Sequence, residues 1–453
     1  MNWPDAMTPV RMRRIAVLAP TARLRDVLLR VAAAGVVDLD HDGTAPTSGT
    51  ATPRLSVQPP DPAAPADLLA GEAQLSAHAA DAVHDGPVFG LLGWCPEPEL
   101  PAIAGRLAEI GAAAVPLTAP AGVDPPTLLP AGGRIGRSFS PLVRTYGTVP
   151  YPDLDPTLPA GIAYVLMFGM MFGDVGHGLV LVAVALLLRA GRPRALARWR
   201  GVWPFVAGAG GTSVVFGLLY GEFFGPTGLL HPLWLAPLDQ PVNLLLAGVG
   251  VGGVLLATAY AIGIVNRWRE GGARLAVYAT SGVAGAGVFL GFGAVAGGLF
   301  WHTAWLAPAG VVIAALGLLL SAVGSAAEAG AGSTRVIQVG VELVEVLIRI
   351  GANVVSFARL AAFGLTHAAL TWLVWRGAVA LAGHGWTGLV GAVVVFALGN
   401  ALAFGLEALV AAIQALRLEF YELFSRVFQT EGRPFQPWHV PVAPAGTDVV
   451  ESP

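Results

Sequence analysis

Long apolar stretches follow one another through most of the chain after Pro150. A bilayer core of about 30 Å is spanned by a helix of about 20 apolar residues. Only 12% of the 453 residues are charged, whereas a soluble protein carries about 25%. The sequence therefore predicts a mainly α-helical, polytopic membrane domain over 151–428, preceded by a small cytoplasmic domain over 1–150.

The distribution of arginine indicates how often the chain crosses. The run 158–189 would make a helix of roughly 48 Å, but Gly173-Asp174-Val175-Gly176-His177-Gly178 interrupts it, and glycines permit a sharp turn. As a hairpin it returns the chain to one side before Arg189, Arg192, Arg194, Arg198 and Arg200. The connections expected on the opposite side, 223–242, 301–303 and 382–386, contain no arginine. This positive-inside asymmetry predicts cytoplasmic termini and eight spans, near 158–172, 176–189, 202–222, 243–265, 275–300, 304–325, 340–381 and 387–426.

The last two apolar runs exceed the bilayer. At about 1.5 Å per residue each would be near 60 Å long, so they must tilt, extend beyond the membrane or break. A pair of long inclined helices is suited to lining a curved partner.

The first 150 residues contain two strand–helix–strand patterns, over 14–39 and 88–117. Two such units predict a ferredoxin-like α+β domain. Between them, 41–66 is rich in Pro and Ala and predicts a linker, followed by a short helix over 67–83. Residues 429–453 form the expected cytoplasmic tail.

Composition excludes several kinds of function. All 26 basic residues are arginines, so the chain has neither a phosphate-loop lysine nor a Schiff-base lysine. We expect no enzyme activity of its own, and another subunit to hydrolyse any ATP involved. Cys95 is the only cysteine, which argues against a metal–thiolate cluster. We expect no cofactor, no metal and, at a net charge of -3, no nucleic-acid partner.

Polar side chains form a stripe on each of the last two segments. At 100° per residue, those of 340–381 fall within roughly 140° and those of 387–426 within roughly 100°. The first stripe holds Glu342, Glu345, Arg349, Asn353, Ser356, Arg359, Thr366 and His367, and the second holds Asn400, Glu407, Gln414, Arg417 and Tyr421. A charge at mid-bilayer costs about 2.5–3.5 kcal/mol on insertion scales, so the stripes indicate an ion path. The structural alternative is that Arg359 and Glu407 form one ion pair that fixes helix packing, and that His367 is a core histidine. This alternative does not explain the length of the two stripes.

Distinct roles follow from the chemistry of these residues. Arg359 keeps its charge at any relevant pH, so it can favour the ionised form of a carboxylate on a moving partner. Glu407 and His367 are candidate proton relays because both change protonation state readily. Other polar residues of the stripes would line the water-accessible approaches to the ion path. They are Glu345, Arg349, Asn353, Ser356, Asn400 and Gln414. Asp174 and His177 fit a structural turn, and Glu222 fits either an exit path or a membrane-interface residue.

Seven motifs resemble the a subunit, or subunit I, of V-type and A-type ATPases. In the membrane part they are Met167-Phe-Gly-Met-Met-Phe-Gly-Asp-Val-Gly-His-Gly178, Ser356-Phe-Ala-Arg-Leu-Ala-Ala-Phe-Gly-Leu-Thr-His-Ala368 and Leu416-Arg-Leu-Glu-Phe-Tyr-Glu422, with Gly432-Arg-Pro-Phe-Gln-Pro-Trp438 after it. In the soluble part they are Met12-Arg-Arg-Ile-Ala-Val-Leu18, Leu92-Gly-Trp-Cys-Pro-Glu97 and Pro125-Pro-Thr-Leu-Leu129.

The resemblance implies a stationary, ion-translocating subunit of a rotary ATPase in a bacterial plasma membrane. Its last two helices would cradle a ring of proteolipid subunits, with Arg359 facing the ring's carboxylate between two proton half-channels. The positions of His367, Glu407 and Arg417 would lie on or beside the proton path, and Glu345 near a channel mouth. The N-terminal domain would contact the peripheral stalk and other subunits, although 41–85 is too short and Pro-rich for the coiled coil that the family usually carries there.

Two other functions are compatible with parts of the sequence. A rotor-independent secondary transporter or channel would often show internal repeats, and the halves of 158–426 show no self-similarity. An intramembrane aspartyl protease would need a second membrane aspartate beside Asp174, but Asp239 falls in an exterior connection.

Overall fold

A computed structural model of the chain describes residues 7–40, 52–62, 64–120, 122–130, 133–329, 332–428 and 431–443. Parts of the expected linker (41–51 and 63) and tail (429–430 and 444–453) lie outside these residues. Two compact units are distinguished, which we call the helical unit (1–7, 131–147 and 152–431) and the mixed unit (8–130, 148–151 and 432–453). Residues 131–147, which the sequence assigns to the N-terminal domain, thus group with the membrane helices.

The mixed unit contains both predicted strand–helix–strand patterns. They are β1 (Met12–Pro20), α2 (Leu24–Ala34) and β2 (Asp38–Leu39), then β5 (Val88–Pro96), α4 (Leu100–Ala108) and β6 (Ala113–Leu117). Short 3-10 turns, η1 (Thr21–Arg23) and η2 (Glu97–Glu99), lead into the helices. The strands form an antiparallel sheet in the order β2-β5-β1-β6, and β4 (Val83–Asp85) pairs with β5.

The C-terminal segment completes the mixed unit. β7 (Val442–Ala443) pairs in parallel with β3 (Leu55–Ser56), which precedes α3 (Ala66–Ala80). Trp438 donates from Nε1 to Gln74 Oε1 at 3.3 Å, and Trp438 and Val440 belong to the same hydrophobic core as α2 and α4. Residues more than 300 positions apart in sequence therefore share one core.

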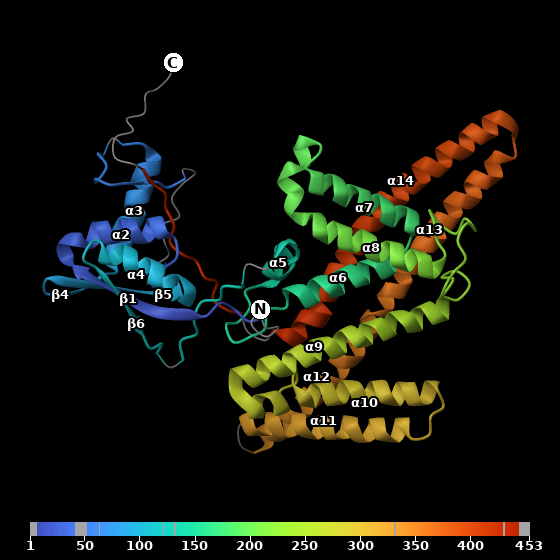
Figure 1. Ribbon diagram of the computed structural model, residues 1–453. Helices are drawn as coiled ribbons and strands as arrows, with labels where there is room; N and C mark the ends of the chain where they lie inside the picture. Colours follow the sequence, from blue (N-terminus) through green and yellow to red (C-terminus); the bar gives the residue numbers. More distant parts are fainter. Residues whose placement is uncertain are drawn as a thin grey trace. The chain divides into compact units, whose positions relative to one another are not determined.

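The helical unit makes the chain mainly α-helical (Figure 1). Its elements are α5 (Arg134–Tyr146), α6 (Thr157–Met171), α7 (Val175–Ala190), η3 (Arg194–Val202), α8 (Trp203–Tyr220), α9 (Pro241–Tyr278), α10 (Val283–Phe300), α11 (Leu306–Glu328), α12 (Ser333–Ser356), α13 (Ala358–Ala382), α14 (Gly385–Leu418), the π-helix η4 (Glu419–Phe424) and α15 (Ser425–Val427). Among the described residues, six helices are long and apolar enough to cross a membrane, while α6 and α7 are apolar but shorter.

Two of the expected segments differ from the helices in the structure. α9 continues through its arginines to Tyr278, with a kink at Gly271 and Gly272, so α10 begins at Val283 rather than at 275. The expected run 340–381 consists of α12 and α13, which meet at Phe357. Neither glycine nor proline marks that junction.

Close packing against α9 fixes the start of α13. Phe357 is fully buried, and a Cβ atom on Gly252 would lie only 2.1 Å from its Cγ atom. Gly248, one turn earlier, faces the backbone nitrogen of Ala361. Small residues at this four-residue spacing let membrane helices approach closely. The contact therefore anchors the backbone two residues before Arg359.

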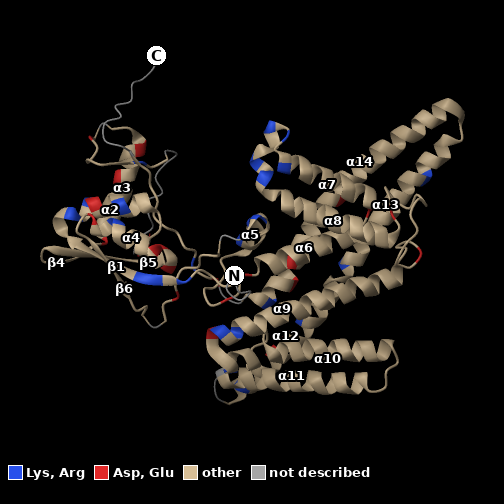
Figure 2. Ribbon diagram, viewed as in Figure 1, with Lys and Arg blue, Asp and Glu red and all other residues tan. Residues whose placement is uncertain are grey.

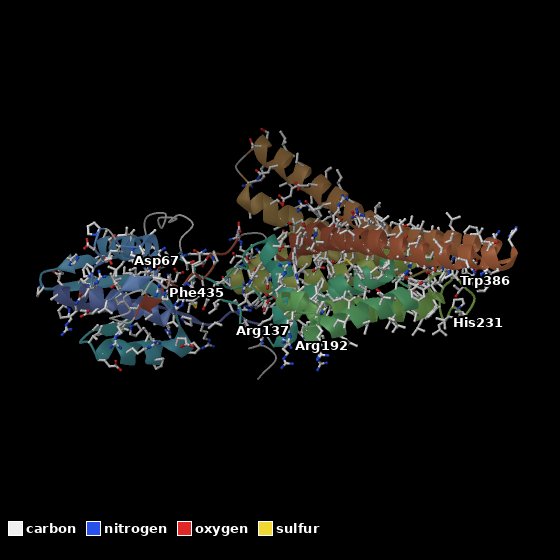
Figure 3. All side chains as sticks on the ribbon, turned by 90° about the horizontal axis from the view of Figure 1, so that it is seen from above. Asp67, Arg137, Arg192, His231, Trp386 and Phe435 are labelled. Carbon is white, nitrogen blue, oxygen red and sulfur yellow. The ribbon has the colours of Figure 1, made fainter. Side chains whose placement is uncertain are left out.

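Arginines gather at one end of the helical unit (Figure 2). They lie on α5, at the end of α7 and along η3. In Figure 3, Arg137 and Arg192 are at one end of this unit, and His231 and Trp386 are at the other. The unit is thus polarised along its helices, as an integral membrane protein is expected to be.

Candidate functional site

The hairpin between α6 and α7 is held by Asp174. This residue is the N-cap of α7, and its Oδ1 atom accepts from the backbone N–H of His177 at 2.9 Å and of Phe224 at 3.0 Å. Its Oδ2 atom accepts from Gly225 N–H at 2.7 Å. An aspartate at this position satisfies N–H groups that the first helical turn leaves free. Asp174 therefore joins the hairpin to the loop after α8.

Two histidines lie together beside this turn. The rings of His177 and His367 are 5.5 Å apart, and both residues are buried. Phe172, Phe224 and Phe404 contact the His177 ring. Neither ring nitrogen of His177 has a hydrogen-bond partner among the described residues, although its Nδ1 atom is 3.6 Å from Asp174 Oδ1.

His367 is bonded to Glu407, and this contact joins α13 to α14. The His367 Nδ1 and Glu407 Oε2 atoms form a hydrogen bond, and Thr371 donates to the His367 carbonyl at 2.8 Å. Glu222, also buried, interacts electrostatically with His367, Glu407 and Asp174. We call Asp174, His177, Glu222, His367 and Glu407 the buried cluster. The two predicted relay residues thus occupy one site together with groups from α7 and the loop after α8.

Three members of the buried cluster have the spacing of a metal site. Donor atoms of Asp174, His177 and His367 lie within 4.8 Å of one another, and a set of imidazole and carboxylate ligands suits a transition metal. Both carboxylate oxygens of Asp174 already accept backbone N–H bonds. Capping therefore explains the position of Asp174 without an ion.

Arg359, the second residue of α13, is half-buried. Within the described part of the chain it forms no ion pair, and its Nη1 atom has no hydrogen-bond partner. The charges that act on it most are those of Arg417 and Glu422. The Arg359–Glu407 ion pair weighed above is not formed, because Glu407 bonds to His367 instead.

The polar residues of α12 contact one another and the end of the chain's last helix. Glu345 and Arg349 form an exposed ion pair on successive turns. With its amide oriented to satisfy both atoms, Asn353 donates to the Arg349 carbonyl at 3.1 Å and accepts from Arg426 Nη2 at 3.0 Å. Arg426 lies 5.3 Å from the centre of the Tyr260 ring.

The remaining predicted residues make fewer hydrogen bonds and ion pairs with the described residues. Asn400 donates to the Phe396 carbonyl at 2.9 Å, and its Oδ1 atom has no partner among the described residues. The same is true of Gln414 Oε1. Arg417 is exposed, and Ser356 ends α12 beside Glu422.

Sequence reasoning missed three buried charged residues that follow α14. Glu419 and Glu422 lie in the π-helix η4, and Arg426 follows it in α15. All three are buried. The family-like motif ending at Glu422 contains two of these residues and could have indicated them. A projection at 100° per residue does not place them on the stripe, because the π-helix changes the periodicity there. Such π segments occur frequently at functional sites.

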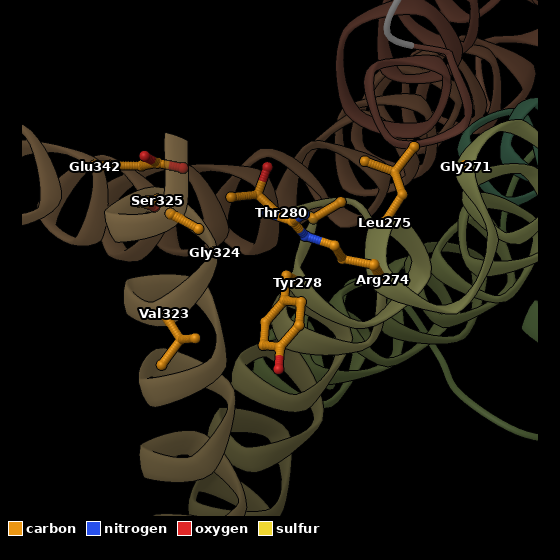
Figure 4. Close-up of a pocket in the computed structure, with 11 residues that line it drawn as sticks. Gly271, Arg274, Leu275, Tyr278, Thr280, Val323, Gly324, Ser325 and Glu342 are labelled. Atoms are coloured by element: carbon orange, nitrogen blue, oxygen red, sulfur yellow. The ribbon is translucent and has the colours of Figure 1, made fainter. Parts of the chain in front are cut away.

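A cavity of about 670 Å³ opens beside Glu342, the first residue of the α12 stripe. Its walls come from the end of α9, the following turn, α11 and α12. In Figure 4, Arg274 of α9 and Glu342 of α12 reach this cavity from different helices. Tyr278 and Thr280, which follow Arg274 in the sequence, also line it. The α12 stripe therefore begins at a space large enough for water.

Known ATPase subunits are similar in sequence to this chain. The sequence model of the V-type ATPase 116 kDa subunit family matches residues 84–235. An A-type ATP synthase subunit I from Pyrococcus horikoshii is 25% identical over 394 residues, covering 82% of this chain and 57% of that protein. The chain is thus similar to this ATPase subunit family, by its family model over 84–235 and by this relative over most of its length.

Other subunit I proteins are similar over different lengths. The A-type ATP synthase subunit I of Archaeoglobus fulgidus is 29% identical over 375 residues, or 70% of this chain and 53% of that protein. The V-type ATP synthase subunit I 2 of Treponema pallidum is 44% identical over 117 residues, or 26% of this chain and 25% of that protein. The chain spans about half the length of the two A-type subunits.

Proposed function

We propose that the chain is the stationary, ion-translocating subunit of a rotary V/A-type ATPase, and that it forms proton half-channels against a proteolipid ring. The observation that carries the proposal is the state of Arg359, which lies in a long apolar helical segment and forms no ion pair with any described residue. An unpaired charge is costly within a bilayer. A carboxylate supplied by another subunit would offset that cost.

The electrostatics of Arg359 give the mechanism. At about 4 Å and an effective dielectric constant near 20, its attraction for a ring carboxylate is about 4 kcal/mol, equivalent to about three pKa units. That is sufficient to deprotonate an acid whose pKa burial has raised. Each ring carboxylate would lose its proton on reaching Arg359 and regain one after passing it.

The buried cluster supports one half-channel and the α12 stripe supports the other. His367 and Glu407 share a hydrogen bond in which a proton can be exchanged, and Glu222, in the loop after α8, interacts electrostatically with both. The cavity at Glu342, followed by Glu345, Arg349 and Asn353, starts at the arginine-rich end. Arg359 lies in the sequence between the α12 stripe and His367.

The finer architecture forms part of the same proposal. The apolar α6–α7 hairpin would supply two further spans beside the six long helices, which would make eight and leave both termini cytoplasmic. The strand order β2-β5-β1-β6 with antiparallel pairing supports a ferredoxin-like mixed unit. That unit would contact the peripheral stalk and other ATPase subunits, and ATP would be hydrolysed by those subunits.

Purification of the tagged full chain from its native membrane tests the proposal. A proteolipid ring and an ATPase head are expected to co-purify with it in a mild detergent. Isolation of the chain without them, together with ion transport by the chain alone in liposomes, would establish a rotor-independent transporter or channel instead.

A further inference from the structure

A second cavity in the helical unit is lined by four arginines. It measures about 410 Å³, and its walls are formed by Arg134, Arg137, Arg189, Arg200, Gly201 and Trp203. No acidic residue lines it. None of the four arginines forms an ion pair with any described residue. We call this space the four-arginine cavity.

Packing of α5 places two of the arginines. Phe139 of α5 meets Phe205 of α8 with ring centres 5.6 Å apart, and Phe205 N–H donates to Ser138 Oγ at 3.1 Å. With this face of α5 buried, Arg134 and Arg137 remain exposed. The amphipathic pattern of α5 therefore presents its charge at the cavity.

The other two arginines are held by contacts at the end of α7. The Arg189 guanidinium lies 5.0 Å from the centre of the Trp203 ring. Arg200 donates from Nη2 to the Arg189 carbonyl at 3.2 Å. Specific contacts thus orient the wall formed by Arg189 and Arg200, and the packing of α5 places the wall formed by Arg134 and Arg137.

The surrounding sequence offers no counter-charge. Between Asp124 and Asp153 there are three arginines and no acid, and between Asp174 and Glu222 there are five arginines and no acid. The chain as a whole carries a net charge of -3, so this basic region is a local concentration. Guanidinium groups bind phosphate through paired, charge-assisted hydrogen bonds. An anion with several acceptor oxygens would satisfy the cavity.

We propose that the four-arginine cavity binds the phosphate group of an anionic phospholipid. Free phosphate has the same acceptor chemistry, but the neighbouring surface favours a lipid. Ile135 on α5 and Leu186 and Leu187 on α7 are at least half exposed, which provides an apolar surface for acyl chains next to the arginines. Trp203 belongs to a residue type enriched at the membrane–water interface. Basic pockets at this level between helices are suited to anionic headgroups.

Lipid binding to the purified full chain tests this proposal. Delipidated protein would be titrated with phosphatidylglycerol, phosphatidylcholine or inorganic phosphate, and binding followed by native mass spectrometry and thermal unfolding. Phosphatidylglycerol is expected to bind most tightly. The double variants Arg134→Gln/Arg137→Gln and Arg189→Gln/Arg200→Gln, one for each wall, are each expected to bind it at least about tenfold more weakly.

Arg144→Gln is the matched control, because Arg144 is exposed on the same helix α5 but does not line the cavity. It is expected to keep the affinity of the wild type. Equal phosphatidylglycerol affinity in all three variants and the wild type would overturn the proposal. Binding of inorganic phosphate as tight as that of the lipid would show a free-anion site and reject the lipid assignment.

Discussion

At the residue scale, the bond between His367 and Glu407 is the contact that links the polar stripes of α13 and α14. Both residues lie in helices whose lengths and apolar character suit a membrane, where an isolated charge is unfavourable. A proton shared between His367 and Glu407 lowers the free-energy cost of placing a charge in the membrane. It also leaves the pair able to accept or release a proton. The sequence predicted both residues as candidate relays from their chemistry, but not that Phe172 would pack against the His367 ring beside their contact.

Replacement of Glu407 tests the relay directly. Glu407→Gln keeps the size of the side chain but removes a group that can ionise, so we expect ATP-driven proton transport to fall at least about tenfold. The measurement is quenching of a pH-sensitive dye in vesicles that contain the assembled complex. Glu109→Gln, at an exposed position of the mixed unit, is expected to leave transport unchanged. Transport at the wild-type rate in Glu407→Gln would remove Glu407 from the proton path.

Asp153, in the loop before α6, gives a pH-dependent prediction. Burial, with the neighbouring Glu270 carboxyl adding to it, raises the pKa of Asp153 from 3.8 to about 8. The folded chain therefore retains a proton that the unfolded chain releases. The free energy of unfolding is expected to decrease as the pH rises from about 4 to about 8.

Asp153→Asn should remove this loss, because asparagine resembles the protonated form. The unfolding temperature of the variant is expected to exceed that of the wild type by a larger margin at pH 8 than at pH 5. Asp239→Asn, at an exposed loop position of the same unit, serves as the control. An equal margin at both pH values would contradict the raised pKa.

At the element scale, the junction of α12 and α13 positions Arg359. Phe357 fills the space above Gly252 of α9, and this contact fixes the first turn of α13. Sequence patterns did not predict the junction, because its cause is a tertiary contact and not a local helix breaker. α5 was missed for a related reason, since its arginines and Pro141 obscure the apolar face that packs against Phe205.

Other elements could be predicted because their signals are local. The turn after α6 follows from its glycines and from Asp174 as an N-cap, and the strands of the mixed unit follow from apolar runs that match β1, β5 and β6. The pairing of β3 with β7 could not be predicted, because two-residue strands have no periodicity and their register depends on the rest of the core. The π-helix that begins at Glu419 could not be predicted either, because no local sequence pattern marks it.

Gly252→Ala tests the packing of α9 against α13. The added Cβ atom would overlap the Phe357 ring, so we expect a loss of about 1–3 kcal/mol in the free energy of unfolding and reduced proton transport. Thermal unfolding of the purified chain measures the first effect. Gly253→Ala is the matched control, because no atom lies within 4 Å of a Cβ at that position. Equal unfolding temperatures for the two variants would show that the contact does not constrain α13.

At the scale of the whole molecule, the chain combines a membrane unit with a compact mixed unit in about half the length of its A-type relatives. The segment after the last helix contributes Trp438 and Val440 to the core of the mixed unit. The N-terminal and C-terminal parts of the sequence are therefore needed together for that unit to be complete. The motif ending at Trp438 indicated a family resemblance but not this structural role.

Trp438→Ala tests that dependence. Trp438 packs against His78 at a ring distance of 4.5 Å and bonds to Gln74, so its loss is expected to cost about 3–5 kcal/mol. Faster proteolysis within 8–130 of the native full chain would report the effect. Trp386→Ala, at a highly exposed position, should leave the rate unchanged. Identical proteolysis of the wild type and Trp438→Ala would mean that the C-terminal segment is dispensable for the mixed unit.

Proton pumping by complexes with altered Arg359 tests the central claim most directly. If this permanent charge faces a carboxylate carried by a rotating ring, Arg359→Lys and Arg359→Ala should abolish ATP-driven pumping while the ring and the ATPase head still co-purify. Arg376→Lys, on the same helix with its guanidinium over Trp372, should pump normally. Normal pumping by Arg359→Ala in an assembled complex would contradict the account.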